Sequence, residues 1–152
     1  MGTTATMGSE GMTSGPIFPE ETASSPVVPG TDGLRTWHGS CHCGRVLFEV
    51  DTVLDRVAIC NCSICSRRNA VMHRVSAERF RLIQGRGALT FYEFATHTAK
   101  HWFCGTCGIY TFHRPRVAPD CYTVNVFCLE GVDRDLVAGL EVQRFDGRSF
   151  PA

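Results

Sequence analysis

The sequence contains no long hydrophobic run and no excess of charge of either sign. It has no stretch of about 18 apolar residues, which excludes a membrane-spanning helix. The 15 basic and 15 acidic side chains give a formal net charge of zero, so the composition offers no reason to expect nucleic acid or an anionic membrane as a partner. The first residues also lack the basic-then-apolar pattern of a secretory signal, which predicts that the chain is not exported.

Cysteine, by contrast, is abundant, with 9 in the 152 residues. The odd number, the missing secretory signal and the tight Cys-x-Cys spacings argue against a disulfide scaffold. In a reducing compartment, close-spaced cysteines are typical of metal sites, so we expect an intracellular, cytoplasmic metal-binding protein. The closely spaced cysteines fall into three groups: Cys41/Cys43, Cys60/Cys62/Cys65 and Cys104/Cys107.

The chain divides by composition into two parts. Residues 1–33 are rich in Gly, Ser, Thr, Pro and Glu, and they predict a flexible N-terminal tail because they cannot bury enough apolar area to offset their ordering entropy. Residues 34–152 predict one zinc-binding domain that is mainly β, with short helical turns only. We expect strands at 46–50, 57–60, 70–75, 80–84, 89–94, 101–104, 109–113 and 122–126. Helical turns are expected at 62–68, 76–79 and 133–138.

Two of the cysteine groups predict a closed structural zinc site. Cys104 and Cys107 are separated by two residues and followed by Gly108, the spacing of a zinc knuckle, which supplies two ligands. Tetrahedral zinc needs four, and the turn with Cys41 and Cys43 is the natural second half. The intervening His42 could point away from the metal or be a ligand itself.

The third group predicts an open zinc site. Cys60, Cys62 and Cys65 offer three thiolates within six residues, enough for one face of a tetrahedron, with the fourth corner left vacant. Cys121 and Cys128 could complete this shell, or they could be ordinary core residues. Three thiolates carry more negative charge than Zn²⁺ carries positive charge, so the metal lowers the pKa of a bound water only a little. It still binds an incoming soft thiolate well. The ligand set therefore favours thiol chemistry over hydrolysis.

In this order and spacing, the seven cysteines resemble those of the glutathione-dependent formaldehyde-activating family. The resemblance covers about residues 36–146, and the segments 39–44, 60–65 and 96–101 are most similar to its centromere protein V-like branch. It implies a β-tent zinc-binding fold. It also implies a structural zinc on Cys41, Cys43, Cys104 and Cys107, and a catalytic-type zinc on Cys60, Cys62 and Cys65.

The activity implied by the resemblance is a carbon–sulfur lyase of the S-hydroxymethylglutathione synthase type. Glutathione is the expected co-substrate, with its thiol at the open zinc and formaldehyde as the aldehyde that it attacks. Arg67, Arg68 and Arg74 lie near the open cluster in sequence and could bind glutathione carboxylates, or they could be ordinary surface residues. His73 could carry protons or be an ordinary strand residue, and one of His97 and His101 could face the cleft.

Two further hypotheses stay open at this point. Both metals could merely hold a protein-interaction surface in a non-catalytic module. The same chemistry could also act on another small thiol or aldehyde. An exchangeable ligand at the second zinc would distinguish the enzyme hypothesis from the hypothesis of a non-catalytic module.

Overall fold

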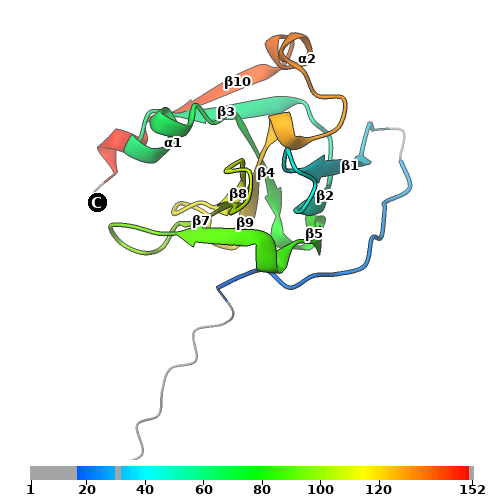
Figure 1. The fold of residues 1–152 in the computed structure, drawn as a ribbon. Helices are drawn as coiled ribbons and strands as arrows, with labels where there is room; N and C mark the ends of the chain where they lie inside the picture. The colour runs from blue at the N-terminus through cyan, green and yellow to red at the C-terminus, as the bar shows by residue number, and fades with distance from the viewer. Residues whose placement is uncertain (1–16, 30–31, 151–152) are drawn as a thin grey trace, which may run out of the picture.

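The computed structural model describes residues 17–29 and 32–150, and their strands form two sheets (Figure 1). The smaller sheet is antiparallel, in the order β1 (Arg35–Ser40), β2 (Leu47–Thr52), β5 (Phe80–Gln84). The larger sheet has seven strands, in the order β10 (Glu141–Phe145), β3 (Arg56–Cys60), β4 (Met72–Ser76), β9 (Cys121–Asn125), β8 (Tyr110–Arg114), β7 (Lys100–Cys104), β6 (Leu89–Tyr92). The predicted mainly-β architecture is confirmed.

An aromatic core joins the two sheets. Phe48 of β2 packs edge-on against Phe112 of β8, with ring centroids 5.6 Å apart. Phe80 of β5 stacks on Tyr122 of β9 at 4.0 Å. Gly39 of β1 leaves room for the Phe48 ring of the neighbouring strand, because a Cβ at Gly39 would lie 2.3 Å from that ring. Burial of these rings stabilises the contact between the two sheets.

The helices are short, as predicted. They are α1 (Ser63–Arg68), α2 (Arg134–Ala138) and the 3₁₀ turns Ala77–Arg79, Arg86–Ala88, Val126–Cys128 and Gly147–Ser149. α1 ends where Asn69 adopts a left-handed conformation (φ 49°), and α2 begins at Asp133, whose side chain accepts a hydrogen bond from the Leu136 N–H. Within residues 17–29 and 32–150, no helix has the length and apolarity needed to cross a membrane.

Two strands were not among the predicted ones. β1 and β10 lack a clear alternation of apolar and polar residues, and their side chains are largely exposed or half-buried. β10 lies at the sheet edge, where it pairs in parallel with β3. Such edge strands are held by backbone pairing with a distant partner, which local sequence patterns do not reveal.

Residues 17–29, which the composition assigned to a flexible tail, lie against the domain in the structure. The Thr22 N–H donates to the Leu82 carbonyl at 2.8 Å. The Glu21 carboxylate accepts hydrogen bonds from the backbone N–H groups of Gly85 and Arg86, each at 2.9 Å. The predicted boundary near residue 33 stays a prediction, but this part of the segment follows the surface of β5.

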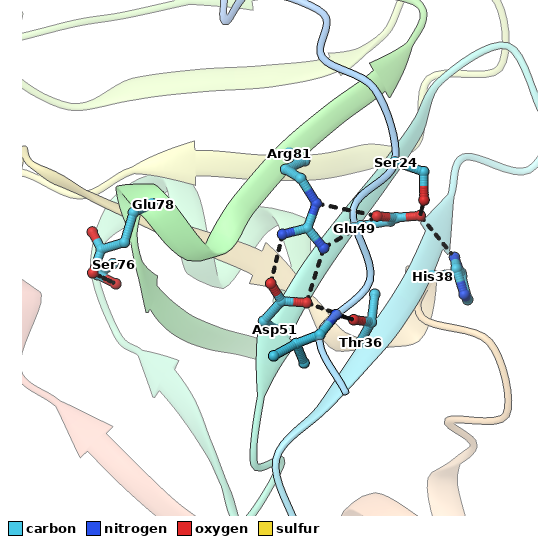
Figure 2. A network of polar contacts seen from close by, with 9 residues as sticks. Ser24, Thr36, His38, Glu49, Asp51, Ser76, Glu78 and Arg81 are labelled. Atoms are coloured by element: carbon cyan, nitrogen blue, oxygen red, sulfur yellow. Dashed lines mark hydrogen bonds and ion pairs between the residues drawn. The ribbon is translucent and has the colours of Figure 1, made fainter. Parts of the chain in front are cut away.

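A network of ion pairs anchors the small sheet beneath this segment (Figure 2). Arg81 of β5 pairs with Glu49 and with Asp51 of β2, and the Glu49 side chain is only 4 % exposed. Ser24 donates to the Glu49 carboxylate, and Thr36 donates to Asp51. The Arg81 guanidinium holds the pKa of the Asp51 carboxyl below its usual value.

Candidate metal centres

The four cysteines of the predicted structural site come together in space. Their sulfur atoms lie within 4.8 Å of one another, although Cys41 and Cys43 follow β1 while Cys104 ends β7 and Cys107 lies in the turn after it. The Cys43 sulfur is 3.6 Å from those of Cys41 and Cys104. Four sulfurs at about 2.3 Å from a tetrahedral zinc are about 3.8 Å apart, so the spacing fits the metal.

Backbone turns prepare these sulfurs for a cation. Gly44 and Gly108 adopt positive φ angles of 75° and 74°, which close the two cysteine turns. The Val46 N–H donates to the Cys41 sulfur at 3.3 Å. The Ile109 backbone N–H lowers the pKa of the Cys107 thiol to about 6. The knuckle half therefore favours the thiolate form that binds zinc. In the other half the backbone N–H of Arg45 lowers the pKa of Cys43, but burial and the neighbouring sulfurs outweigh it and raise that pKa to about 11.

The second cluster contains Cys60, Cys62 and Cys65. Cys60 ends β3, Cys62 caps the start of α1 and Cys65 lies in its first turn, so a strand end and a helix start bring the three sulfurs within 4.8 Å. The Cys62 N–H donates to the Cys60 sulfur at 3.4 Å. All three residues are half-buried, and burial raises the pKa of Cys65. The chemistry and spacing of these donors suit a soft cation such as zinc.

No fourth side-chain ligand joins this trio among residues 17–29 and 32–150. No other histidine, cysteine, aspartate or glutamate there has a ligand atom close enough to join it. Cys121 belongs to β9, and Cys128 is buried with its sulfur 3.7 Å from the Tyr110 carbonyl. All nine cysteines are free thiols. A metal held by the three sulfurs would therefore have an open coordination position.

The turn after β10 covers the three-cysteine cluster, a contact that the sequence analysis missed. A Cβ on Gly147 would lie 2.5 Å from the Cys60 sulfur, so only glycine fits there. Asn61 holds this turn: its amide donates to Asp146 at 2.7 Å, and its side-chain and backbone oxygens accept from Arg148 at 3.0 and 2.8 Å. The sequence carried no signal for this contact, because it depends on the parallel pairing of β10 with β3.

The three cysteines form part of the wall of a cavity of about 370 Å³. Its wall also includes aromatic side chains and two buried histidines, namely Phe94, Phe145, Phe150, His101 and His113. Burial lowers the pKa of His101 to about 4 and that of His113 well below its usual value, so both rings are neutral at pH 7. The arrangement is a reactive sulfur cluster facing a mostly apolar chamber that a small thiol could enter.

Residues 36–141 match the family described as glutathione-dependent formaldehyde-activating enzyme. This match spans more than half of the chain. The chain belongs to this family. A crystal structure of a Rhodobacter sphaeroides protein is also similar, with 42 % sequence identity and a TM-score of 0.65, covering 70 % of this chain and 99 % of that one.

Arg67, Arg68 and His73, three of the residues that sequence proximity associated with glutathione, lie outside this cavity wall. On α1 of this family member, Arg67 donates back to the Ser63 carbonyl at 2.8 Å, and Arg68 stacks 4.1 Å from the Tyr110 ring centre. His73 is buried and uses both ring nitrogens, towards Thr52 and the Arg56 carbonyl, each at 2.8 Å. A role for these three in glutathione binding stays a prediction.

Arg74 and His101, by contrast, both line the cavity. His97 is instead exposed and pairs with Glu93 at 3.2 Å.

Proposed function

We propose that this family member is a zinc-dependent carbon–sulfur lyase that joins a glutathione thiol to formaldehyde and reverses that reaction. The observation that carries the proposal is the trio of Cys60, Cys62 and Cys65, which has no fourth side-chain ligand among the described residues and faces a cavity. Zinc on this trio would supply the positive charge that keeps an incoming thiol deprotonated at neutral pH. The finer assignment to the centromere protein V-like branch stays a prediction.

The reaction itself needs little covalent help from the chain. The glutathione sulfur bonds to the aldehyde carbon, and the carbonyl π electrons move to oxygen. The thiol proton leaves to solvent and a solvent proton reaches that oxygen, so the product is the hydroxymethyl thioether. The task of the protein is to hold the thiolate beside the aldehyde and to stabilise the negative charge that develops on oxygen.

His101 is the group that we assign to that oxygen. Its Nδ1 lies 2.9 Å from the Tyr110 hydroxyl, and its Nε2 is buried without a partner among the described residues. A buried hydroxyl group points its hydrogen at an acceptor, so the Tyr110 hydroxyl donates to Nδ1 of His101. The neutral His101 ring then carries its own proton on Nε2. A neutral N–H donor in the cavity wall suits a developing alkoxide without placing a cation beside the sulfurs.

The seven predicted ligand cysteines must stay reduced for this activity, so we place the protein in the cytoplasm. The aromatic side chains of Phe94, Phe145 and Phe150 in the cavity wall would make the surroundings of the reacting atoms less polar and so strengthen the His101 hydrogen bond.

The direct test measures S-hydroxymethylglutathione formation by NMR exchange with ¹³C-formaldehyde, because the adduct also forms without a catalyst. We expect the zinc-loaded chain to exceed the uncatalysed rate and Cys62→Ser to return to it. Cys121→Ser is the matched control, since Cys121 belongs to neither cluster, and it should keep the full rate.

A second measurement separates the enzyme from a structural module. Cobalt replaces zinc, and glutathione is titrated while the sulfur-to-cobalt absorption is recorded. A spectral change in wild type that Cys62→Ser lacks supports the proposal. No change and no acceleration would mean that both clusters are structural, and acceleration with a different thiol or aldehyde only would keep the chemistry and replace the substrate.

A further inference from the structure

A row of polar side chains crosses four neighbouring strands of the large sheet. Arg74 of β4 is paired with Thr123 of β9, Thr123 with His113 of β8, and His113 with His101 of β7. Residues directly opposite one another on adjacent strands project from the same face. The four side chains therefore lie side by side on one face of the sheet.

This polar row joins the cysteine-lined cavity to a second cavity of about 470 Å³. The two cavities share the wall residues Arg74, His113, Pro115 and Phe145. Arg74 stands at this boundary, with its guanidinium 5.6 Å from the centre of the Phe145 ring. The two cavities are therefore neighbours, and a molecule whose sulfur is at the cysteine trio would pass Arg74 to reach the second one.

Two polar groups in the second cavity wall lack partners. Thr123 is 5 % exposed and His113 is 7 % exposed, and both line the second cavity. Thr123 Oγ1 and His113 Nδ1 are buried without a hydrogen-bond partner among the described residues. Buried polar groups are nearly always satisfied, so these two indicate that a polar ligand or ordered water completes the wall.

The second cavity is also positively charged. Arg56, Arg74 and Arg79 line it, and Asp55 is its one acidic lining residue within the described part of the chain. Asp55 is already paired with Arg56 at 2.8 Å. Arg74 and Arg79 form no ion pair with any carboxylate in residues 17–29 and 32–150. Two planar guanidinium groups are thus left for an anion, and their geometry suits a carboxylate.

We propose that the second cavity binds a carboxylate of the thiol substrate, with Arg79 and Arg74 as its cationic partners and Thr123 as a hydroxyl partner. The chain would then select acidic peptide thiols over neutral thiols. This inference rests on the proposed thiol site, and it assigns the part of the substrate remote from the sulfur.

Calorimetry on the zinc-loaded full chain tests the second cavity without any chemistry at sulfur. The probe is S-methylglutathione, which keeps both carboxylates and has no free thiol, compared with its diethyl ester. We expect the diester and the Arg79→Gln variant each to weaken binding by about tenfold or more, the usual loss when a charge-assisted hydrogen bond disappears. Arg134→Gln is the matched control: Arg134 lies on α2, stacks on Phe127 and lines neither cavity.

The outcomes divide cleanly between the two proposals. Equal affinity for S-methylglutathione and its diester, an unchanged Arg79→Gln, or no binding of the probe overturns the carboxylate pocket. The thiol site is judged separately, by adding 2-mercaptoethanol, which has no carboxylate, to the cobalt-loaded chain. If that thiol leaves the cobalt spectrum unchanged, the thiol site fails, whatever the calorimetry reports.

Discussion

Replacing Gly147 by alanine should weaken metal binding at the three-cysteine cluster while leaving the four-cysteine cluster intact. The new methyl carbon would lie 2.5 Å from the Cys60 sulfur and 2.7 Å from the Cys62 Cβ, whereas ordinary contacts begin at 3.4 Å. The sulfur or the turn must therefore move by about 0.9 Å. Zinc–sulfur distances tolerate about 0.2 Å, so the required shift exceeds what the site accepts.

Either way of relieving this contact harms the site. Movement of Cys60 spoils the ligand geometry, and movement of the turn breaks the hydrogen bonds that Asn61 donates to Asp146 and accepts from Arg148. Loss of such support around a metal ligand typically lowers affinity 10- to 100-fold, which corresponds to about 1.4–2.7 kcal/mol.

The assay is stepwise zinc release to a chelator of graded strength, with the zinc counted per chain. Gly87→Ala is the control, because a Cβ there meets nothing within 4 Å. An unchanged release profile for Gly147→Ala would refute the geometric reasoning, because it would mean that the turn does not constrain the cluster.

Three more predictions concern stability. Cys104→Ser should abolish cooperative folding, because structural zinc contributes on the order of 10 kcal/mol to the folding of small domains. Cys62→Ser should remove one zinc and keep the thermal unfolding transition. Equal loss of folding in both variants, measured by thermal melting with zinc counted per chain, would contradict this division. Arg81→Met should destabilise the domain by about 3–5 kcal/mol in urea unfolding, because it leaves the buried Glu49 carboxylate without its guanidinium partner. A loss below about 1 kcal/mol would mean that solvent and the remaining partners compensate that charge. Folding lowers the pKa of Asp51, so its stabilising contribution is complete at neutral pH and is lost as pH falls from about 3.9 through the folded value. Asp51→Asn should flatten that part of a curve of unfolding free energy against pH. An unaltered curve would mean that other groups cause the loss of stability in acid.

The sequence revealed the two cysteine clusters because metal ligands are recognisable by type and spacing. A knuckle such as Cys104 to Cys107 is local, and so is the trio that begins at Cys60. The mainly-β class was equally accessible, since short alternating runs such as Val46 to Val50 predict strands.

The residues that surround the clusters are brought there by pairing between strands that are distant in the sequence. The row from Arg74 to His101 exists only because four strands align in one register, and no local pattern encodes that register. Sequence proximity also does not give the direction of a side chain. Arg67 and Arg68 follow the trio directly, and in the structure Arg67 donates to the Ser63 carbonyl while Arg68 lies over the Tyr110 ring.

The parallel pairing of β10 with β3 sets an order of events during synthesis. Cys60, Cys62 and Cys65 leave the ribosome long before Gly147, yet the turn at Gly147 completes their surroundings. Because a nascent chain emerges from its N-terminus, this cluster stays uncovered until translation has passed residue 148. Any metal that this cluster binds would therefore gain its full surroundings late in synthesis, and a chain that lacks the turn at Gly147 would leave these thiols uncovered.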